Sequence, residues 1–220
     1  MTRDAQSASG SSRDQLLAAT AALMIETGSI DVPLSEIAAR SGLNSALVKY
    51  YFGGKSGLLV ALANDVLGRA LIQLDDLMQM DLDPVEKIKL HIKGVITTYY
   101  RYPFVNRLLH ALFLQSDTAA EVGQNICRPL ANTQQQLLEQ AEQAGLIRPI
   151  DPLMFFFIVL GACDHLFFGQ NILKHAFSVD TIDDDLRRRY TDTLIDLILR
   201  GLLIEKDGAT TAVTVKSGRG

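Results

Sequence analysis

Long apolar runs and cysteines are both scarce in this chain. The longest uninterrupted apolar run, residues 153–163, has 11 residues, whereas a helix needs about 20 to cross a bilayer. Residues 1–12 are polar and serine-rich, without the apolar segment of a signal peptide. We therefore expect no membrane span. Cys127 and Cys163 are too few for a disulfide framework, which favours a cytoplasmic protein with free thiols.

The sequence motifs of metal sites and of catalysis are also missing. Neither Glu-x-x-His, His-x-x-x-His nor Cys-x-x-Cys occurs, so a metal site in a helical bundle lacks its ligands. The residues around Gly53-Gly54 do not complete a phosphate-binding loop. Asp164 and His165 are adjacent, but neighbours on a helix point about 100° apart and cannot both face one small site. We predict no enzymatic activity, no metal and no cofactor.

Acidic residues are absent from one segment of an otherwise acidic chain. The formal net charge is −4, which by itself argues against binding to nucleic acid. Between residues 37 and 64, however, the only charged side chains are Arg40, Lys49 and Lys55. Such a locally basic stretch can meet phosphate while the rest of the chain stays soluble. Three cations also fit an ordinary solvated surface, so the charge pattern leaves both interpretations open.

Helical periodicity, in contrast, runs through almost the whole chain. Apolar residues recur at helical spacing in nine segments, residues 13–27, 34–41, 45–52, 55–80, 84–101, 104–114, 119–144, 153–168 and 184–203. Gly28, Gly42 and Gly145 supply stop signals, and Asn44 and the Asp-Pro pairs at 83 and 151 supply start signals. No alternating strand pattern followed by a hairpin turn occurs, apart from a short alternating stretch in residues 212–215. The sequence predicts an all-α fold.

Residues 34–52 form the segment with a functional pattern. Two short predicted helices flank a tight turn at Gly42-Leu43, which is the spacing of a helix-turn-helix motif. In this motif the second helix lies in the DNA major groove. The spacing places Val48 and Phe52 toward the first helices and leaves an outward set, comprising Asn44, Ser45, Leu47, Lys49 and Tyr51. A glycine between short helices is common, so the pattern alone does not establish DNA binding.

The residues themselves strengthen this interpretation. Residues 37–59, IAARSGLNSALVKYYFGGKSGLL, resemble the signature of the TetR family of transcriptional regulators. The resemblance covers about residues 13–62, and the remainder resembles the family only as a helical body of the expected length. It implies an N-terminal three-helix DNA-binding domain and a larger helical domain for effector binding and dimerisation. We accordingly expect a disordered tail over 1–12, a DNA-binding domain over 13–56, a body over 57–205 and a flexible tail over 206–220.

The resemblance also implies roles for individual residues. Ser45, Ala46 and Leu47 fall where the family reads bases, Lys49, Tyr50 and Tyr51 where it contacts phosphates, and Lys55 where the next helix meets the DNA backbone. These types suit the roles, because hydroxyls and cations bind phosphate and small apolar groups meet thymine methyls. The alternative for the two tyrosines is that they only cover the core of the domain. Two departures are Lys49, where a tyrosine is usual, and Val32-Pro33, where threonines are common.

The resemblance implies a small-molecule effector pocket in the body, but no residue of the sequence identifies the ligand. Tyr99, Phe156 and His165 are our candidate lining residues, although aromatic side chains at helical spacing also suit a plain core. Basic side chains reaching the pocket would favour an anionic compound, with four candidates in Arg101, Arg107, His110 and His165.

The last two long helices predict a homodimer. Residues 153–168 are apolar on every side, and the final helix carries a broad apolar stripe, consisting of Leu186, Tyr190, Leu194, Leu197, Ile198 and Leu202. A dimer would bind a palindromic double-stranded operator. The expected function is a ligand-responsive regulator, most often a repressor in this family. The alternative is a non-catalytic all-α interaction module with an incidental helix-turn-helix, and steeply salt-dependent binding to a duplex distinguishes the two.

Overall fold

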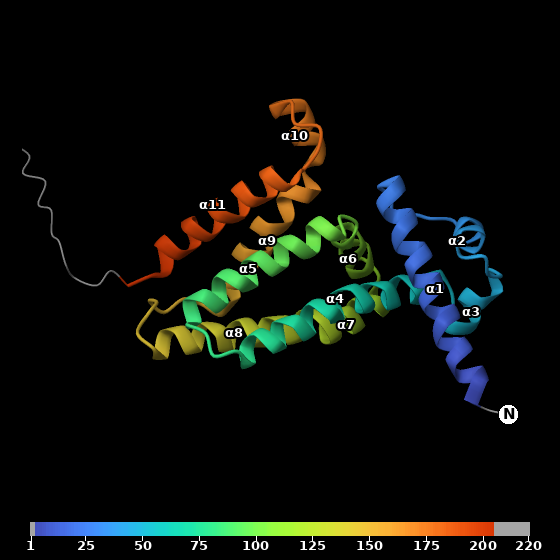
Figure 1. The fold of residues 1–220 in the computed structure, drawn as a ribbon, viewed down its shortest axis with the longest axis horizontal. Coiled ribbons are helices and arrows are strands. Elements are labelled where there is room, and N and C mark those ends of the chain that lie inside the picture. Colours follow the sequence, from blue (N-terminus) through green and yellow to red (C-terminus); the bar gives the residue numbers. More distant parts are fainter. Residues whose placement is uncertain (1–2, 205–220) are drawn as a thin grey trace, which may run out of the picture.

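The computed structural model describes the backbone of residues 3–204 and the side chains from residue 12 onward. Its elements, labelled in Figure 1, are α1 (Arg3–Thr27), α2 (Leu34–Ser41), α3 (Ala46–Phe52), α4 (Lys55–Gln79), α5 (Pro84–Arg101), α6 (Val105–Phe113), α7 (Ser116–Val122), the π-helical turn η1 (Gly123–Cys127), α8 (Arg128–Gln143), α9 (Pro152–Phe168), α10 (Gln170–Phe177) and α11 (Asp184–Leu202). Over residues 3–204 the only β-type pairing is an isolated bridge between Ile147 and Leu203. The all-α prediction is confirmed.

The helices form a small head and a larger body (Figure 1). The head consists of α1, α2 and α3, and the body consists of α5 to α11 with η1. The long helix α4 begins in the head, where it packs on α1 and α3, and continues through the body, where it packs on α5, α6, α7, η1 and α8. A single helix thus connects the two parts.

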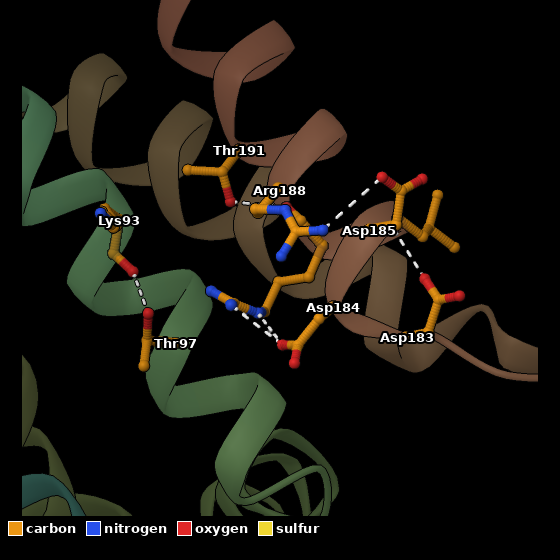
Figure 2. A network of polar contacts seen from close by, with 9 residues as sticks. Lys93, Thr97, Asp183, Asp184, Asp185, Arg188 and Thr191 are labelled. Atoms are coloured by element: carbon orange, nitrogen blue, oxygen red, sulfur yellow. Dashed lines mark hydrogen bonds and ion pairs between the residues drawn. The ribbon is translucent and has the colours of Figure 1, made fainter.

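Side-chain caps explain where several body helices begin. Asp83, Asp151 and Asp183 each precede a helix, and each accepts a hydrogen bond of 2.8 Å from a backbone N–H of the first turn. Figure 2 shows Asp183, the third cap, beside Asp184. Asp184 pairs with Arg187 at 3.0 Å within the first turn of α11. Such a cap stabilises a helix by about 1 kcal/mol. The helix starts predicted at Asp83 and Asp151 are therefore confirmed.

The first helix is longer than the sequence indicates. The structure begins α1 at Arg3, ten residues before the start expected at Arg13, so residues 3–12 continue the helix where a disordered tail was expected. Serine and alanine in this segment carry no apolar stripe, which is why periodicity did not include it. The tail expected over 206–220 lies outside the described residues.

Two body elements differ from the periodicity. The helix expected over 119–144 is divided into α7, η1 and α8, and α10 was not predicted at all. Pro129 accounts for the division, because it lacks the N–H that would bond to the carbonyl of Asn125, and its ring crowds that carbonyl. The chain widens to a π-helical turn directly before it. In α10 no residue is buried, although Ile172, Leu173, Ala176 and Phe177 recur at helical spacing along it.

One apolar core runs through head and body, from Leu16 and Val48 to Phe155 and Leu202. Among the described residues, α4 is long and apolar enough to span a membrane, and the bent pair α9–α10, with 63° between its helices, passes the same test together. A third of the α4 window is buried inside the protein. The core helix of a water-soluble protein meets these criteria as well, so they carry no argument for a membrane.

Candidate DNA-binding surface and effector cavity

The turn between α2 and α3 has the geometry of a helix-turn-helix. Gly42 ends α2 with a φ of 69°, a left-handed conformation that glycine adopts without strain. The N–H of Leu43 then donates to the carbonyl of Ala38 at 3.2 Å. Asn44 Oδ1 accepts a hydrogen bond of 2.8 Å from the N–H of Ala46 and so starts α3. The glycine stop and the asparagine start are both placed as the sequence indicates.

Apolar packing fixes the orientation of α3 on α1 and α2. Val48 is fully buried in α3, Ile37 is buried in α2, and both belong to the same core as Leu16 and Met24 of α1. Val32, in a position where the family commonly has threonine, is buried in this core as well. The three helices of the head therefore form one packed unit that can present α3 rigidly.

The exposed face of α3 differs in part from the expected one. Ser45, Ala46, Lys49 and Tyr50 are exposed, and the Tyr50 side chain is 77% exposed. Leu47 and Tyr51 were expected to point outward, but both are half-buried and pack against the core. Helix geometry explains this, because at 100° per residue Tyr51 lies only 60° from the buried Val48, whereas Tyr50 lies on the opposite side.

Lys55 has a partner within the head. Its Nζ donates to Asp31 Oδ1 at 2.5 Å, across the start of α4. This hydrogen bond, and then the charge of Lys55, lower the pKa of the Asp31 carboxyl. The lysine lies where the sequence predicts a phosphate contact, but it has to exchange a carboxylate for a phosphate in order to make that contact.

The body contains an apolar cavity of about 350 Å³. It is lined by residues of α4, α5, α6, η1, α8 and α9, together with Met80 after the end of α4. Its wall is largely leucine, and its polar members are Gln73, His91, Thr98, Tyr99 and Cys127. The volume lies at the lower end of the range for pockets that bind small molecules.

No ionised side chain lines this cavity. Burial lowers the pKa of His91 to about 4, so its ring is neutral at pH 7. The His91 Nε2 atom lies 2.7 Å from Gln134 Nε2, and the amide can donate to the ring only when Nε2 carries no proton. Burial also raises the pKa of the Tyr99 hydroxyl and that of the Cys127 thiol, so both stay protonated. The polar groups of the wall are neutral hydrogen-bonding groups.

A second pocket, of about 300 Å³, adjoins the cavity between α4 and α5. The two share five lining residues, Ala70, Gln73, Leu90, Gly94 and Thr98. Unlike the cavity, the second pocket is lined by three cations, Arg69, Lys93 and Arg101, and by no acidic residue. Of these, Arg69 is paired with Asp65 at 2.8 Å.

The structure brings one of the three candidate pocket residues to the cavity. Tyr99 lines it, whereas Phe156 and His165 do not. His165 is exposed on α9, and Phe156 is half-buried against Phe157. Sequence reasoning missed the contributions of α4 and η1, since leucines such as Leu74 look like ordinary core. Pro129 was the available signal that the chain widens at η1, where Ile126 and Cys127 enter the wall.

Large apolar side chains are exposed along α9 and near the end of α11. On α9 these are Met154, Phe157, Ile158 and Phe168, between 52% and 66% exposed, and on α11 Leu197 is 65% exposed. Of the stripe predicted on α11, Leu186, Tyr190, Leu194 and Ile198 are half-buried, and Leu202 is buried in the core of its own chain. Tyr190 donates its hydroxyl proton to the carbonyl of Ala162 within the same chain.

A helix-turn-helix head joined by one long helix to a helical body with an apolar cavity defines a DNA-binding regulator of the ligand-responsive class. Comparison with known families gives the particular family. Residues 16–62 match the family described as bacterial regulatory proteins, tetR family, and residues 81–208 match the tetracyclin repressor-like C-terminal domain. The chain belongs to the TetR family of DNA-binding transcriptional regulators.

Relatives with known names agree with this assignment. The HTH-type transcriptional repressor NicS of Pseudomonas putida is 21% identical over 196 residues, which cover 86% of this chain and 92% of NicS. The regulator FadR of Bacillus subtilis, solved with stearoyl-CoA, has a TM-score of 0.67 at 18% identity and covers 85% of this chain and 97% of its own. AibR, solved with isovaleryl coenzyme A and operator DNA, has a TM-score of 0.66 at 22% identity and covers 84% and 97%. At these identities the solved structures show that the fold is shared.

Proposed function

We propose that the protein is a homodimeric repressor, which binds a palindromic operator through α3 of each head and is released by a small molecule in the body cavity. The observation that carries the DNA-binding part is the exposed face of α3, where Tyr50 is 77% exposed beside the exposed Lys49 although its ring makes an edge contact with Tyr51. Regulators of this family are in general not enzymes, and we infer the same of this cytoplasmic chain.

On DNA, the exposed side chains divide by chemistry. Ser45 and Ala46 lie at the start of α3 and are the candidates for contacts with base edges, as hydroxyl and methyl groups. Lys49 and Tyr50 follow one turn later and are the candidates for phosphate contacts. Leu47 and Tyr51 are half-buried, so only part of each side chain can touch DNA, and we assign them contacts at the periphery of the interface. Lys55 joins them once it leaves Asp31.

The dimer is supported by the exposed apolar face of α9. Two copies of Met154, Phe157, Ile158 and Leu197, covered by each other, would remove a patch that a soluble monomer rarely exposes. Leu186, Tyr190, Leu194 and Ile198 would then border the interface with their remaining surface. Leu202 plays no part in it. A four-helix interface of this kind belongs to the obligate class of roughly 2,000 Å² or more.

The effector acts through α4 in this proposal. Lys55 stands at its start in the head, and Leu74 and Leu77 line the cavity about 30 Å further along, at 1.5 Å per residue. A ligand that fits the cavity better when α4 is tilted would shift the heads apart, since only differential affinity moves such an equilibrium. FadR and AibR were solved with acyl-coenzyme A compounds, which supports an effector with an apolar part.

The test is duplex binding by the wild-type protein and two α3 variants, on operators selected from a random pool. Lys49→Ala and Tyr50→Ala should each weaken binding about tenfold, because a hydrogen bond to a charged group contributes about 1.5–3 kcal/mol. Lys49→Ala should also reduce the salt slope by about one. Lys89→Ala, on α5, removes the same charge far from α3 and should change neither.

The remaining alternative is an interaction module with an incidental helix-turn-helix. It predicts weak binding to every duplex and the same affinity for Lys49→Ala and Lys89→Ala. That pair of results would reject the regulatory function.

A further inference from the structure

The second pocket is a cationic surface that adjoins the apolar cavity, and two of its three cations are available. Lys93 and Arg101 are exposed, about two helical turns apart on α5, and neither side chain makes an ion pair within residues 12–204. Arg69, opposite them on α4, is held by Asp65. Lys93 takes part in Figure 2 only through its backbone carbonyl, which accepts from Thr97.

The inside of the cavity cannot hold a charge. His91 is neutral above a pH of about 4, and Tyr99 and Cys127 remain protonated. An anionic group placed among these leucines would lose its hydration without gaining a cation. A charged ligand must therefore leave its charge outside, where the two pockets meet at Gln73, Leu90 and Gly94, the exposed members of the shared wall.

We infer that the effector is a single-chain amphiphile, whose acyl chain fills the cavity and whose anionic head is bound by Lys93 and Arg101. This inference rests on the proposed function, since it specifies the ligand of the same cavity. The volume of about 350 Å³ favours a chain of medium length over a long one. Carboxylate and phosphate share this chemistry, so a free fatty acid and an acyl-coenzyme A are both possible sources.

Gly94 gives a direct way to close the entrance. It lies on α5 between the two pockets, and a Cβ built there meets no atom within 4 Å. Gly94→Leu therefore fills the passage with a side chain and also removes a helix-destabilising glycine, so the variant should fold at least as stably as the wild type. Gly68→Leu on α4 is the matched control, since Gly68 has equally free space but lines neither pocket.

The experiment measures the binding of four probes to the full-length protein by calorimetry, namely octanoyl-CoA, octanoate, 1-octanol and coenzyme A alone. At least one octanoyl anion should bind ten times more tightly than octanol. Coenzyme A alone should bind weakly, because it lacks the chain. Whichever of octanoate and octanoyl-CoA binds more tightly identifies the source of the anionic group, and either result supports the inference.

The variants locate the two ends of the ligand. Replacing both cations, Lys93→Gln with Arg101→Gln, should weaken the anionic probe about tenfold or more and leave octanol unchanged. Gly94→Leu should abolish binding of every octanoyl probe, and Gly68→Leu should bind like the wild type. Equal affinity of octanol and the anions, unchanged affinity in the double variant, or full binding by Gly94→Leu would each overturn the inference.

Operator binding without any ligand is measured in parallel and separates the two claims. All three variant proteins should keep the wild-type operator affinity. If operator binding persists while no octanoyl probe binds, the ligand assignment alone is wrong. If the wild type binds no operator, the regulatory function is wrong, whatever the probes do.

Discussion

The head and the body place their functional groups in different ways. In the head, the side chains proposed to meet DNA lie within residues 45–55, from the residue before α3 to the first residue of α4. In the body, the cavity draws on six helical elements between Leu67 and Leu160. The head can therefore be specified by a short motif, whereas the cavity exists only after the whole body has packed. Changes that affect one part and spare the other test this division.

The largest expected effect comes from separating the two protomers. Phe157→Glu with Leu197→Glu changes two residues that are about two-thirds exposed in the single chain, so folding should be unaffected. Light scattering should show a mass of 24.1 kDa in place of twice that value. Operator affinity should fall about a hundredfold or more, because two linked heads gain from effective concentration.

Ile72→Glu with Leu114→Glu provides the matched control. Both residues are exposed and apolar, at 65% and 88%, but lie on α4 and after α6, outside the two helices α9 and α11 of the proposed interface. This pair should leave the dimer and its operator affinity unchanged. A dimer that survives Phe157→Glu with Leu197→Glu places the interface on another surface.

The second effect concerns the titration of His91 in the cavity wall. Its pKa is about 4 in the folded protein, where burial disfavours the charged ring, against about 6.5 when unfolded. Between these values the unfolded chain binds more protons, so stability is full above pH 6.5 and is lost as the pH falls toward 4. From pH 6.5 to pH 5 the loss should be roughly 2 kcal/mol, at 1.36 kcal/mol per unit.

Urea unfolding of the wild type and of His91→Gln at both pH values measures this contribution. The variant cannot titrate at this position, so its stability should depend less steeply on pH. The two proteins losing the same stability between pH 6.5 and pH 5 would show that His91 is protonated in the folded state. Because the head contains no histidine, operator contacts themselves should not follow this titration.

The same division explains how far the sequence could predict the molecule. The turn at Gly42, the asparagine start of α3 and the family itself follow from local residues, and each is confirmed. At 100° per residue Tyr51 lies 60° from the buried Val48 and Tyr50 lies on the opposite side, so the positions of these two tyrosines follow from the sequence. Leu47 and Lys49 are equally far from Val48, so the spacing alone does not show that Leu47 is the half-buried one.

The body was less predictable for a physical reason. Leu74 and Leu109 line the cavity. A leucine in a helical stripe gives the same sequence pattern whether it packs against another side chain or lines a cavity. Phe156 and His165 were selected by residue type, and neither reaches the cavity. The helix α10, in contrast, was predictable, because Ile172, Leu173, Ala176 and Phe177 recur at helical spacing although none of them is buried.

A smaller effect should come from the contact between the body and the end of α1. Arg107 on α6 donates from Nη1 to the carbonyl of Gly28 at 2.5 Å, and Leu109 on the same helix lines the cavity. We expect Arg107→Gln to bind effector and operator separately like the wild type, while effector weakens operator binding about fivefold less, the equivalent of one hydrogen bond of about 1 kcal/mol.

Operator titrations with and without a saturating effector measure this coupling, and effector titrations with and without operator should return the same factor. Arg128→Gln on α8 removes the same charge without a contact to the head and serves as the control. If effector releases Arg107→Gln from DNA as fully as it releases the wild type, the coupling passes through α4 alone.

The smallest effect should come from the ion pair that occupies Lys55. Its partner Asp31 is 89% exposed and is held ionised by the lysine, which lowers the pKa of the carboxyl. On a duplex, Asp31 competes with a phosphate for Lys55. Asp31→Asn keeps the shape and removes the charge, so operator affinity should rise by about two- to fivefold, as expected for one exposed pair, and the salt slope should become steeper by about one.

Lys55→Ala should have the opposite effect, and the double variant should match Lys55→Ala, because Asp31 then has no lysine to release. This double-mutant cycle distinguishes two roles of Asp31, namely competition with a phosphate for Lys55 and positioning of Lys55 for DNA. If Asp31 serves to hold Lys55 in position for DNA, Asp31→Asn weakens the operator complex, and the double variant is no weaker than either single one. Higher operator affinity of Asp31→Asn, with a steeper salt dependence, would show that Lys55 contacts a phosphate in the complex and is paired with Asp31 in the free protein.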